Sequence, residues 1–227
     1  MVGNYAYNPT SNLGNLEGGG VYISNSYVTV SNCLIRGNTN QTAYASTISH
    51  ALGGGIAVLT GAVTISECLI MDNVLIAARN TYGAGLYILG GTHRIEHTVL
   101  QGNYGILSSG GLTYNRGDGF YLGGTNARAA LFNSLVNGNY RDGVHVEAGA
   151  TLHILNSTIT GHGRYGANRT NAWLAITNSI LWRNDVDVGG TGTIAGVDSY
   201  WFGRRVGFAA RVSDRVKELH QRIHYPL

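Results

Sequence analysis

One short pattern recurs six times along the chain, and it limits the fold more than any other feature. Each copy consists of a small residue, two mostly apolar residues, two variable residues and a final Asn, which is His in one copy. A glycine precedes each copy by 13 to 15 residues, and successive copies are 22 to 36 residues apart. Equivalent positions at such regular spacing predict a repeat architecture, in which each unit is stable only against its neighbours. The copies begin at Cys33, Cys68, Thr98, Ser134, Ser157 and Ser179. We expect the recurrent asparagines to lie in turns in the left-handed conformation and to form a ladder of side-chain amides; they are Asn38, Asn73, Asn103, Asn139 and Asn184.

The stretch between each glycine and the small residue has the pattern of β-strands. Apolar residues alternate with other residues from Val21 to Val30 and again from Ile56 to Ile65. A period of two indicates strands rather than helices. We therefore predict an all-β parallel β-helix of about six coils over residues 1–200, with equivalent strands paired about 4.8 Å apart. A β-propeller is the alternative, but its blades of roughly 40 residues fit the spacing less well.

The first coil contains two characteristic runs, Gly18-Gly19-Gly20-Val21-Tyr22-Ile23 and Asn32-Cys33-Leu34-Ile35-Arg36-Gly37-Asn38. On these runs the chain resembles right-handed parallel β-helix proteins of the pectate-lyase-like superfamily. It is most similar to the glycine-rich repeats of polymorphic outer-membrane proteins and related bacterial surface proteins. The resemblance covers residues 18–184 and implies a right-handed coil and an extracellular or cell-surface location. The superfamily includes polysaccharide lyases, glycoside hydrolases and non-catalytic adhesins, among which a shared fold does not choose.

The two ends of the chain depart from the repeat in different ways. The pair Gly3-Asn4 has the form that closes later coils, so we expect the chain to start inside a coil and to leave that coil uncapped. Such an end predicts either that the chain is a fragment of a longer protein or that another chain covers the first coil in an end-to-end contact. Residues 201–227 form a tail in which apolar residues follow helical spacing over 209–223, which predicts an amphipathic capping helix. A segment foreign to the repeat and a basic anchor are the alternatives for this tail.

Charge and hydropathy exclude several classes of protein. Residues 203–227 hold six basic and two acidic residues (+4), which leaves nine basic and ten acidic residues (−1) for the rest of the chain. A nearly neutral body argues against nucleic acid as a partner. No apolar run reaches the roughly 18 residues of a membrane span. The first residues lack the pattern of a signal peptide, so we expect any export signal to lie outside this chain.

A row of aromatic residues is the best candidate for a binding face. If the residue after each glycine points inward, the next one points outward, once in every coil. The insertions at 39–52, 74–82 and 104–116 precede this strand, and as long loops they would wall a groove. Aromatic rings at coil spacing would offer a stacking face to sugars, although tyrosines in strands also stack simply for stability. The outward row is Tyr22, Ala57, Tyr87, Tyr121 and His145.

Two carboxylates are the best candidates for catalysis. Asp118 and Asp142 precede equivalent glycines of adjacent coils, so we expect them about 5 Å apart. This separation suits a retaining glycosidase pair or a shared Ca²⁺ ion. Asp-Gly is also a favoured turn dipeptide, which by itself explains both residues. Four nearby side chains would contribute to an enzyme site or neutralise an acidic sugar: Arg116, Arg141, His145 and Glu147.

The two cysteines occupy the same position in successive copies. Cys33 and Cys68 should therefore be neighbours, but side chains that point the same way give poor disulfide geometry. We predict two buried free thiols. There is no spacing typical of metal ligands, so no metal site and no cofactor are predicted beyond the Ca²⁺ alternative.

These observations favour a non-catalytic extracellular or cell-surface module that binds a polysaccharide or glycan, or acts like an adhesin, along the tyrosine-bearing strand. The first alternative is a polysaccharide lyase or glycoside hydrolase that uses Asp118, Asp142, Arg141 and His145. The second alternative is a structural spacer.

Overall fold

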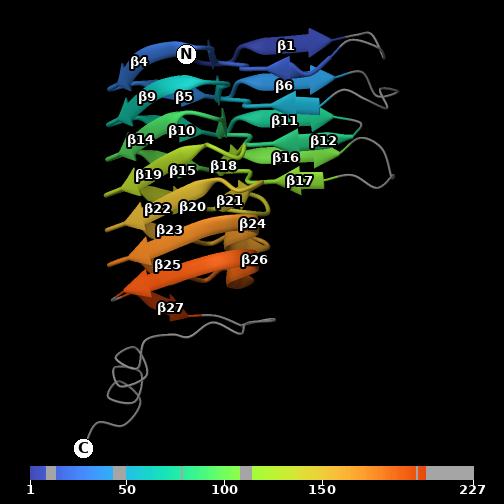
Figure 1. Ribbon diagram of the computed structural model, residues 1–227. Helices are drawn as coiled ribbons and strands as arrows, with labels where there is room; N and C mark the ends of the chain where they lie inside the picture. The colour runs from blue at the N-terminus through green and yellow to red at the C-terminus, as the bar shows by residue number, and fades with distance from the viewer. Residues whose placement is uncertain (9–13, 43–49, 78, 108–113, 198, 203–227) are drawn as a thin grey trace, which may run out of the picture.

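The computed structural model describes residues 1–8, 14–42, 50–77, 79–107, 114–197 and 199–202. These ranges contain no helix, and their strands pair in parallel, each with the equivalent strand of the next coil. The coils stack along one axis (Figure 1), which confirms the predicted all-β parallel β-helix. The helix predicted over 209–223 lies outside the described residues.

Three walls of stacked strands form the body of the molecule. The first wall consists of β5 (Leu34–Arg36), β10 (Leu69–Met71), β15 (Val99–Gln101), β20 (Leu135–Asn137), β23 (Thr158–Thr160), β25 (Ile180–Trp182) and β27 (Tyr200–Phe202). The second consists of β3 (Val21–Ile23), β8 (Ile56–Val58), β13 (Leu86–Leu89), β18 (Phe120–Gly123) and β21 (Val144–Glu147). The third consists of β4 (Ser26–Ser31), β9 (Gly61–Ser66), β14 (Thr92–Glu96), β19 (Arg128–Phe132) and β22 (Thr151–Leu155). The long strands β24 (Tyr165–Thr177) and β26 (Val186–Val197) continue through both the second and third walls.

The core of the body follows directly from the repeat. Side chains alternate along a strand, so of the two apolar residues in each copy only one faces inward. It is the second, and in all six copies this residue is at most 1% exposed. The first points outward, as Leu34 and Ile180 do at the two ends of the series. The inward residues are Ile35, Ile70, Leu100, Val136, Ile159 and Leu181.

Eight further strands form a lobe on one side of the first four coils, seen on the right of Figure 1. The outer lobe sheet consists of β1 (Tyr5–Asn8), β6 (Thr39–Thr42), β11 (Val74–Ala77) and β16 (Tyr104–Leu107). The inner lobe sheet consists of β2 (Leu16–Glu17), β7 (His50–Leu52), β12 (Asn80–Tyr82) and β17 (Tyr114–Arg116). The insertions, expected as long loops, are thus largely paired strands in their described parts, because stacking lets each insertion bond to its equivalent in the next coil.

The recurrent asparagines form the predicted ladder of side-chain amides. Each amide nitrogen donates to the side-chain oxygen of the next asparagine, at 2.9–3.0 Å. The expectation that these asparagines take the left-handed conformation is wrong. The residue before each of them takes it instead, for example Gly37 with φ 63° and Asp72 with φ 55°. The ladder residues are Asn4, Asn38, Asn73, Asn103 and Asn139. Asn184 continues the ladder beyond His162, since its side-chain oxygen accepts a hydrogen bond from the backbone amide of His162 at 3.1 Å.

The ladder also explains the glycine that precedes each copy. A Cβ atom on Gly55 would lie 2.6 Å from the carbonyl oxygen of Gly85 and 2.9 Å from the amide nitrogen of Asn73. The same steric conflict arises at Gly20, Gly119 and Gly166. The spacing between glycine and Asn stays within 18 to 20 residues because the amide packs directly on the glycine.

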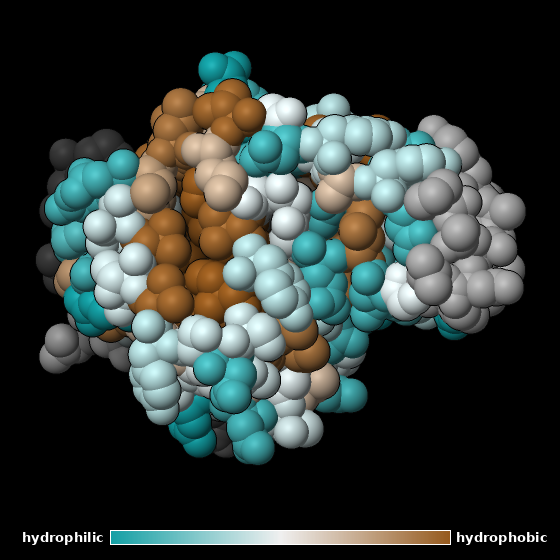
Figure 2. Space-filling view, turned by 90° about the horizontal axis from the view of Figure 1, so that it is seen from above, coloured by the Kyte–Doolittle hydropathy of each residue, from teal (hydrophilic) through white to brown (hydrophobic). Residues whose placement is uncertain are grey.

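Apolar side chains are visible at the end of the stack formed by the first coil (Figure 2). Val21, Val28 and Val30 pack against the core there but remain only half-buried. The end-to-end contact expected at this surface stays a prediction. Among the described residues, no helix combines the length and hydropathy of a membrane span.

The cysteines lie side by side at the start of the first wall. The adjoining residues Leu34 and Leu69 pair in register, and the amide of Leu69 donates to the carbonyl oxygen of Cys33 at 2.9 Å. Both cysteines are free thiols, as predicted, but only Cys68 is buried, whereas Cys33 is half-buried. Burial raises the pKa of the Cys68 thiol.

Candidate functional site

The aromatic row on the second wall lies in the register that the repeat predicts. Tyr87 pairs with Tyr121, and Tyr121 pairs with His145, across adjacent strands. The rings of Tyr87 and Tyr121 stack at 5.3 Å between centroids, and those of Tyr121 and His145 at 5.9 Å. The row is therefore a continuous stack of rings along three coils.

The expectation that this row is open to solvent is wrong for its central members. Tyr87, Tyr121 and His145 are 5%, 7% and 2% exposed, and only Tyr22 at the end of the row is open. The inner lobe sheet covers them, since Leu52 packs in the same apolar cluster and Tyr82 lies on its edge. The insertions thus pack on the row instead of walling an open groove, and the flat faces of these rings are not available to a sugar.

Charged groups surround one end of the covered row. The Tyr121 hydroxyl donates to a Glu147 carboxylate oxygen at 3.1 Å, and the same carboxylate forms an ion pair with Arg116 at 2.5 Å. Burial raises the pKa values of the Tyr87 and Tyr121 hydroxyls, so both stay protonated. Arg116 and Glu147 therefore neutralise each other, and neither is a free charge for an acidic ligand.

Asp118 lies in the turn between the lobe and the second wall, and it is 1% exposed. One carboxylate oxygen accepts a hydrogen bond from the backbone amide of Arg141 at 2.8 Å, and the backbone of Gly105 contributes another. Burial raises the pKa of Asp118 to about 8, against the opposing effect of these hydrogen bonds, and the nearby charge of Asp142 adds to the rise. The side chain of Arg141 points to solvent.

Asp142 occupies the equivalent turn one coil later and is fully buried. Arg164 binds it with two nitrogens, at 2.7 Å to one oxygen and 2.6 Å to the other. The His145 ring nitrogen Nδ1 lies 3.3 Å from the second oxygen. Burial would raise the pKa of Asp142, but the hydrogen bonds from His145 and Arg164 hold it below its usual value.

This cluster closes the last layer of the lobe. The coil that follows has no lobe strands, so the backbone groups of β16 and β17 have no strand beneath them. Asp118 accepts from Gly105 of β16, and Arg164 donates to the carbonyl oxygen of Asn115 of β17 at 3.4 Å. Because an unpaired buried backbone group is costly, these side chains replace the missing strand.

The cluster is poorly arranged for the chemistry expected of it. A glycosidase pair must reach the scissile bond, yet neither carboxylate is exposed. The Ca²⁺ alternative also does not fit, since the Arg164 guanidinium already occupies both oxygens of Asp142. Among the described residues, no group of three or more His, Cys, Asp or Glu is placed to hold a metal ion.

Three exposed tyrosines lie on a different surface, which the sequence reasoning missed. On the outer lobe sheet Tyr5, Tyr7 and Tyr104 are 62%, 47% and 37% exposed, and Ile106 is also open. The rings of Tyr5 and Tyr7 stack at 6.2 Å, and the Tyr5 hydroxyl donates to Gln41 at 2.7 Å. We call this surface the outer lobe face; its outward residues are Tyr5, Tyr7, Thr39, Gln41, Val74, Ile76, Tyr104 and Ile106.

A sequence signal for this surface exists. The residue after each ladder Asn points outward, so the ladder itself marks the row: Tyr5, Thr39, Val74, Tyr104 and Tyr140. The backbone amide of Tyr140 donates to the carbonyl oxygen of Asn103 at 3.1 Å, as that of Tyr104 donates to the carbonyl oxygen of Asn73 at 3.0 Å. The row therefore continues past the lobe.

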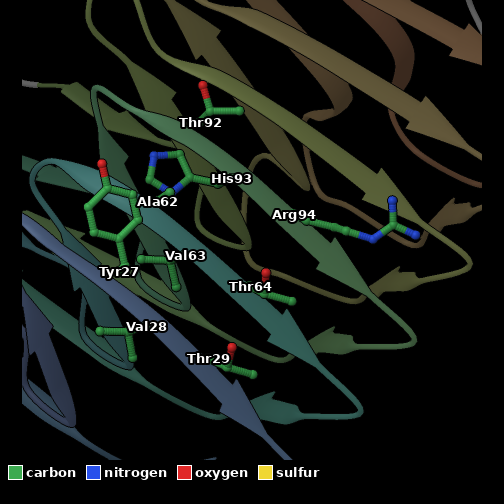
Figure 3. A pocket seen from close by; sticks show the side chains of 9 residues that line it. All are labelled: Tyr27, Val28, Thr29, Ala62, Val63, Thr64, Thr92, His93 and Arg94. Carbon is green, nitrogen blue, oxygen red and sulfur yellow. The ribbon is translucent and has the colours of Figure 1, made fainter.

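A shallow hollow of about 400 Å³ lies elsewhere, on the outer side of the third wall (Figure 3). Tyr27 stands at one side of it, and Arg94 extends away from Tyr27 at the other. The hollow spans β4, β9 and β14 and is lined by Tyr27, Val28, Thr29, Ala62, Val63, Thr64, Thr92, His93 and Arg94.

Comparison with known proteins adds no relative to this geometry. No family model matches the chain, and neither does any curated protein or any solved structure.

Proposed function

We propose that the protein is a non-catalytic extracellular or cell-surface module that binds glycans through the outer lobe face. The observation that carries this proposal is the exposure of Tyr5, Tyr7 and Tyr104 on one sheet of parallel strands. Exposed aromatic rings stack on the apolar faces of sugars, and their hydroxyls bond to sugar hydroxyls. We also propose, from the resemblance of the repeat, that the chain is a member of the pectate-lyase-like superfamily and is located outside the cell or on its surface.

The composition of the outer lobe face supports this proposal. Its outward residues carry no charge, so a neutral glycan chain meets no unpaired ion on it. Thr39 and Gln41 lie between the aromatic positions and supply hydrogen-bonding groups. A rigid sheet holds all of these side chains at fixed spacing, which lowers the entropy cost of binding an extended ligand.

The state of the carboxylates favours a binding role over the enzymatic alternative. A lyase or hydrolase needs Asp118 or Asp142 to reach its substrate, and both are buried in contacts that close the lobe. An assay for unsaturated uronate or new reducing ends tests the alternative. Product formation that is lost in Asp142→Asn, with the fold intact, would replace our proposal by the enzymatic one.

A glycan array tests the proposed function. We expect weak binding that the triple variant Tyr5→Ser, Tyr7→Ser, Tyr104→Ser reduces at least tenfold, because three stacking rings are lost. Tyr22→Ser is the matched control, since Tyr22 is an exposed tyrosine on the body. Equal binding by the triple variant and the parent would refute the proposal. Loss of glycan binding in Tyr22→Ser alone would place the site on the aromatic row of the second wall. If no glycan binds at all, the structural spacer is the remaining function.

A further inference from the structure

The hollow on the third wall has an origin in the strand register. Tyr27 of β4 pairs with Ala62 of β9, and Thr92 of β14 takes the next position in the same outward column. The side chain of Ala62 ends at one methyl group, so a gap opens between the larger neighbours on either side. The hollow is therefore a defined feature of three adjacent coils (Figure 3).

The side of the hollow formed by Tyr27 is an unoccupied aromatic surface. Tyr27 is 91% exposed, the highest value among the large apolar side chains of the described residues. In the described part of the chain, its ring stacks on no other ring. A ring that is fixed on a strand and open on its faces presents an apolar plane to a ligand at little entropy cost.

The floor supplies hydroxyl groups with unused hydrogen-bonding capacity. Thr29 and Thr64 pair in register beside the gap, and Thr92 closes its far side. None of these three hydroxyls bonds to another group within the described ranges. Each is a donor and an acceptor, which matches a ligand whose rim carries hydroxyls.

The charge beside the hollow is already neutralised. The Arg94 side chain contacts Glu96 at 2.6 Å and lies over the ring of Phe132 at 5.2 Å. Its guanidinium is therefore drawn away from Tyr27, as Figure 3 shows, and its charge is balanced. An anionic ligand gains little here, whereas a neutral one avoids desolvating an ion.

We propose that this hollow is a second ligand site, which takes one neutral sugar ring stacked on Tyr27 and hydrogen-bonded to the threonines. The volume of about 400 Å³ lies within the range of small-molecule sites, and a pyranose has the required apolar face and hydroxyl rim. The site is on the third wall and shares no residue with the outer lobe face, so it does not depend on the function proposed above. Because the hollow is shallow, the affinity is weak, with a Kd of about 1 mM or higher.

NMR titration of the whole chain tests this proposal. A panel of neutral methyl hexosides, with glucuronate as the charged comparison, is added to protein labelled at its Ala and Thr methyl groups. We expect at least one neutral hexoside to shift the methyl signals of Ala62, Thr64 and Thr92 in a saturable way, and glucuronate to bind no better. No saturable shift for any hexoside, or stronger binding of glucuronate that salt abolishes, would overturn the proposal.

Three variants make the test specific. Ala62→Leu fills the gap from an outward position and should abolish binding, whereas Thr64→Val keeps the shape and should weaken it about threefold to tenfold. Tyr27→Ala should weaken it at least tenfold. Trp182→Ala, which removes an exposed ring from the first wall, is the control and should leave the ligand-induced shifts of Ala62, Thr64 and Thr92 unchanged. Binding that survives Ala62→Leu would place the sugar elsewhere and refute the hollow as its site.

Discussion

The coils that carry the lobe and the coils that lack it contain the same repeat. They differ in how the chain connects the ladder Asn of one coil to the glycine that opens the second wall in the next. Between Asn103 and Gly119 the chain passes through two lobe strands, whereas between Asn139 and Gly143 it crosses directly. The body continues unchanged across this step, because its walls pair on both sides of it. Only the lobe ends there, and its last strands are closed by side chains instead of by a further coil.

The comparison shows how a repeat protein hosts a local addition. An insertion that recurs in consecutive coils forms its own parallel sheets, but the last copy always leaves a free edge. In this protein the edge coincides with a group of charged residues, namely Asp118, Arg141, Asp142, Arg164 and Glu147. A charged cluster at the end of an inserted sheet therefore has a structural explanation before a catalytic one.

The largest expected effect comes from removing the closure of this edge. Asp142→Ala should lower the free energy of unfolding by about 3 kcal/mol, because it leaves the partly buried Arg164 without its partner. Urea denaturation at neutral pH measures the change. Arg36→Ala is the matched control, since its ion pair with Asp72 is exposed and should contribute less than about 1 kcal/mol. Equal losses in the two variants would show that the edge cluster has no special role.

The next largest effect is a pH dependence of stability that arises in the ladder of the coils without a lobe. His162 replaces Asn in these coils. Its Nδ1 accepts a hydrogen bond from the backbone amide of Asn139 at 3.1 Å, and its Nε2 lies 3.2 Å from the Val136 carbonyl oxygen. Burial lowers the pKa of His162 to about 4. Protonation is thus favoured in the unfolded chain, and stability of up to about 3 kcal/mol should be lost as the pH falls from 6.5 through 4.

His162→Asn should remove this loss, because an amide makes the same bonds and does not titrate. Denaturation of the two proteins between pH 7 and 4 measures the difference in slope. His153→Asn, at an exposed position of β22, is the control and should leave the slope of the parent. Parallel profiles for the parent and His162→Asn would contradict the neutral state of His162.

Over the limited range from pH 6 to 8, a smaller effect of opposite sign should come from Asp118. Its raised pKa of about 8 means that the folded protein holds a proton which the unfolded chain has already released. Stability should therefore fall as the pH rises, on the order of 2 kcal/mol between pH 6 and 8. Asp118→Asn keeps an acceptor for the Arg141 amide and should flatten the profile, as denaturation across this range would show. An unchanged slope would mean that Asp118 is ionised in the fold.

The smallest effects test what the two kinds of coil share. Gly55→Ala in a coil with a lobe and Gly166→Ala in a coil without one both press a Cβ onto the amide of a ladder asparagine, and each should cost about 2 kcal/mol. Gly138→Ala meets no atom within 4 Å and should cost only about 1 kcal/mol, through its φ of 56°. Thermal unfolding of the three variants gives the ranking. A cost at Gly166 no larger than that at Gly138 would show that the ladder packs differently beyond the lobe.

The fold was predictable because the repeat encodes both the strands and their partners. Apolar residues at a period of two specify strands, and the nearly constant spacing from glycine to Asn specifies which strands are neighbours. The stacking of Tyr87 on Tyr121 followed from that register alone. The seventh strand of the first wall, β27, was missed because the sequence that starts at Ser199 lacks the final Asn of the pattern and has no glycine 13 to 15 residues before it.

The candidate site was only partly predictable. The register correctly placed Tyr121 beside His145 and Asp142 one coil after Asp118, but it gave no information on what covers them. Arg164, which binds Asp142, lies one coil further along at the position equivalent to Arg141, and the repeat did not show that its side chain would reach the carboxylate. The exposed tyrosines of the outer lobe face were missed because the predicted row was taken from the strand after each glycine. These tyrosines belong instead to the strand that begins directly after a ladder Asn.

The sequence by itself determined that this chain stacks in parallel coils, because a coil can bury its apolar side chains only against coils of the same form. The tertiary structure alone decided which aromatic rings remain open and what the carboxylates bind. The lobe strands pack on the second wall and then end, so burial of Tyr87 and closure by Asp118 and Asp142 depend on contacts between segments that the repeat does not relate.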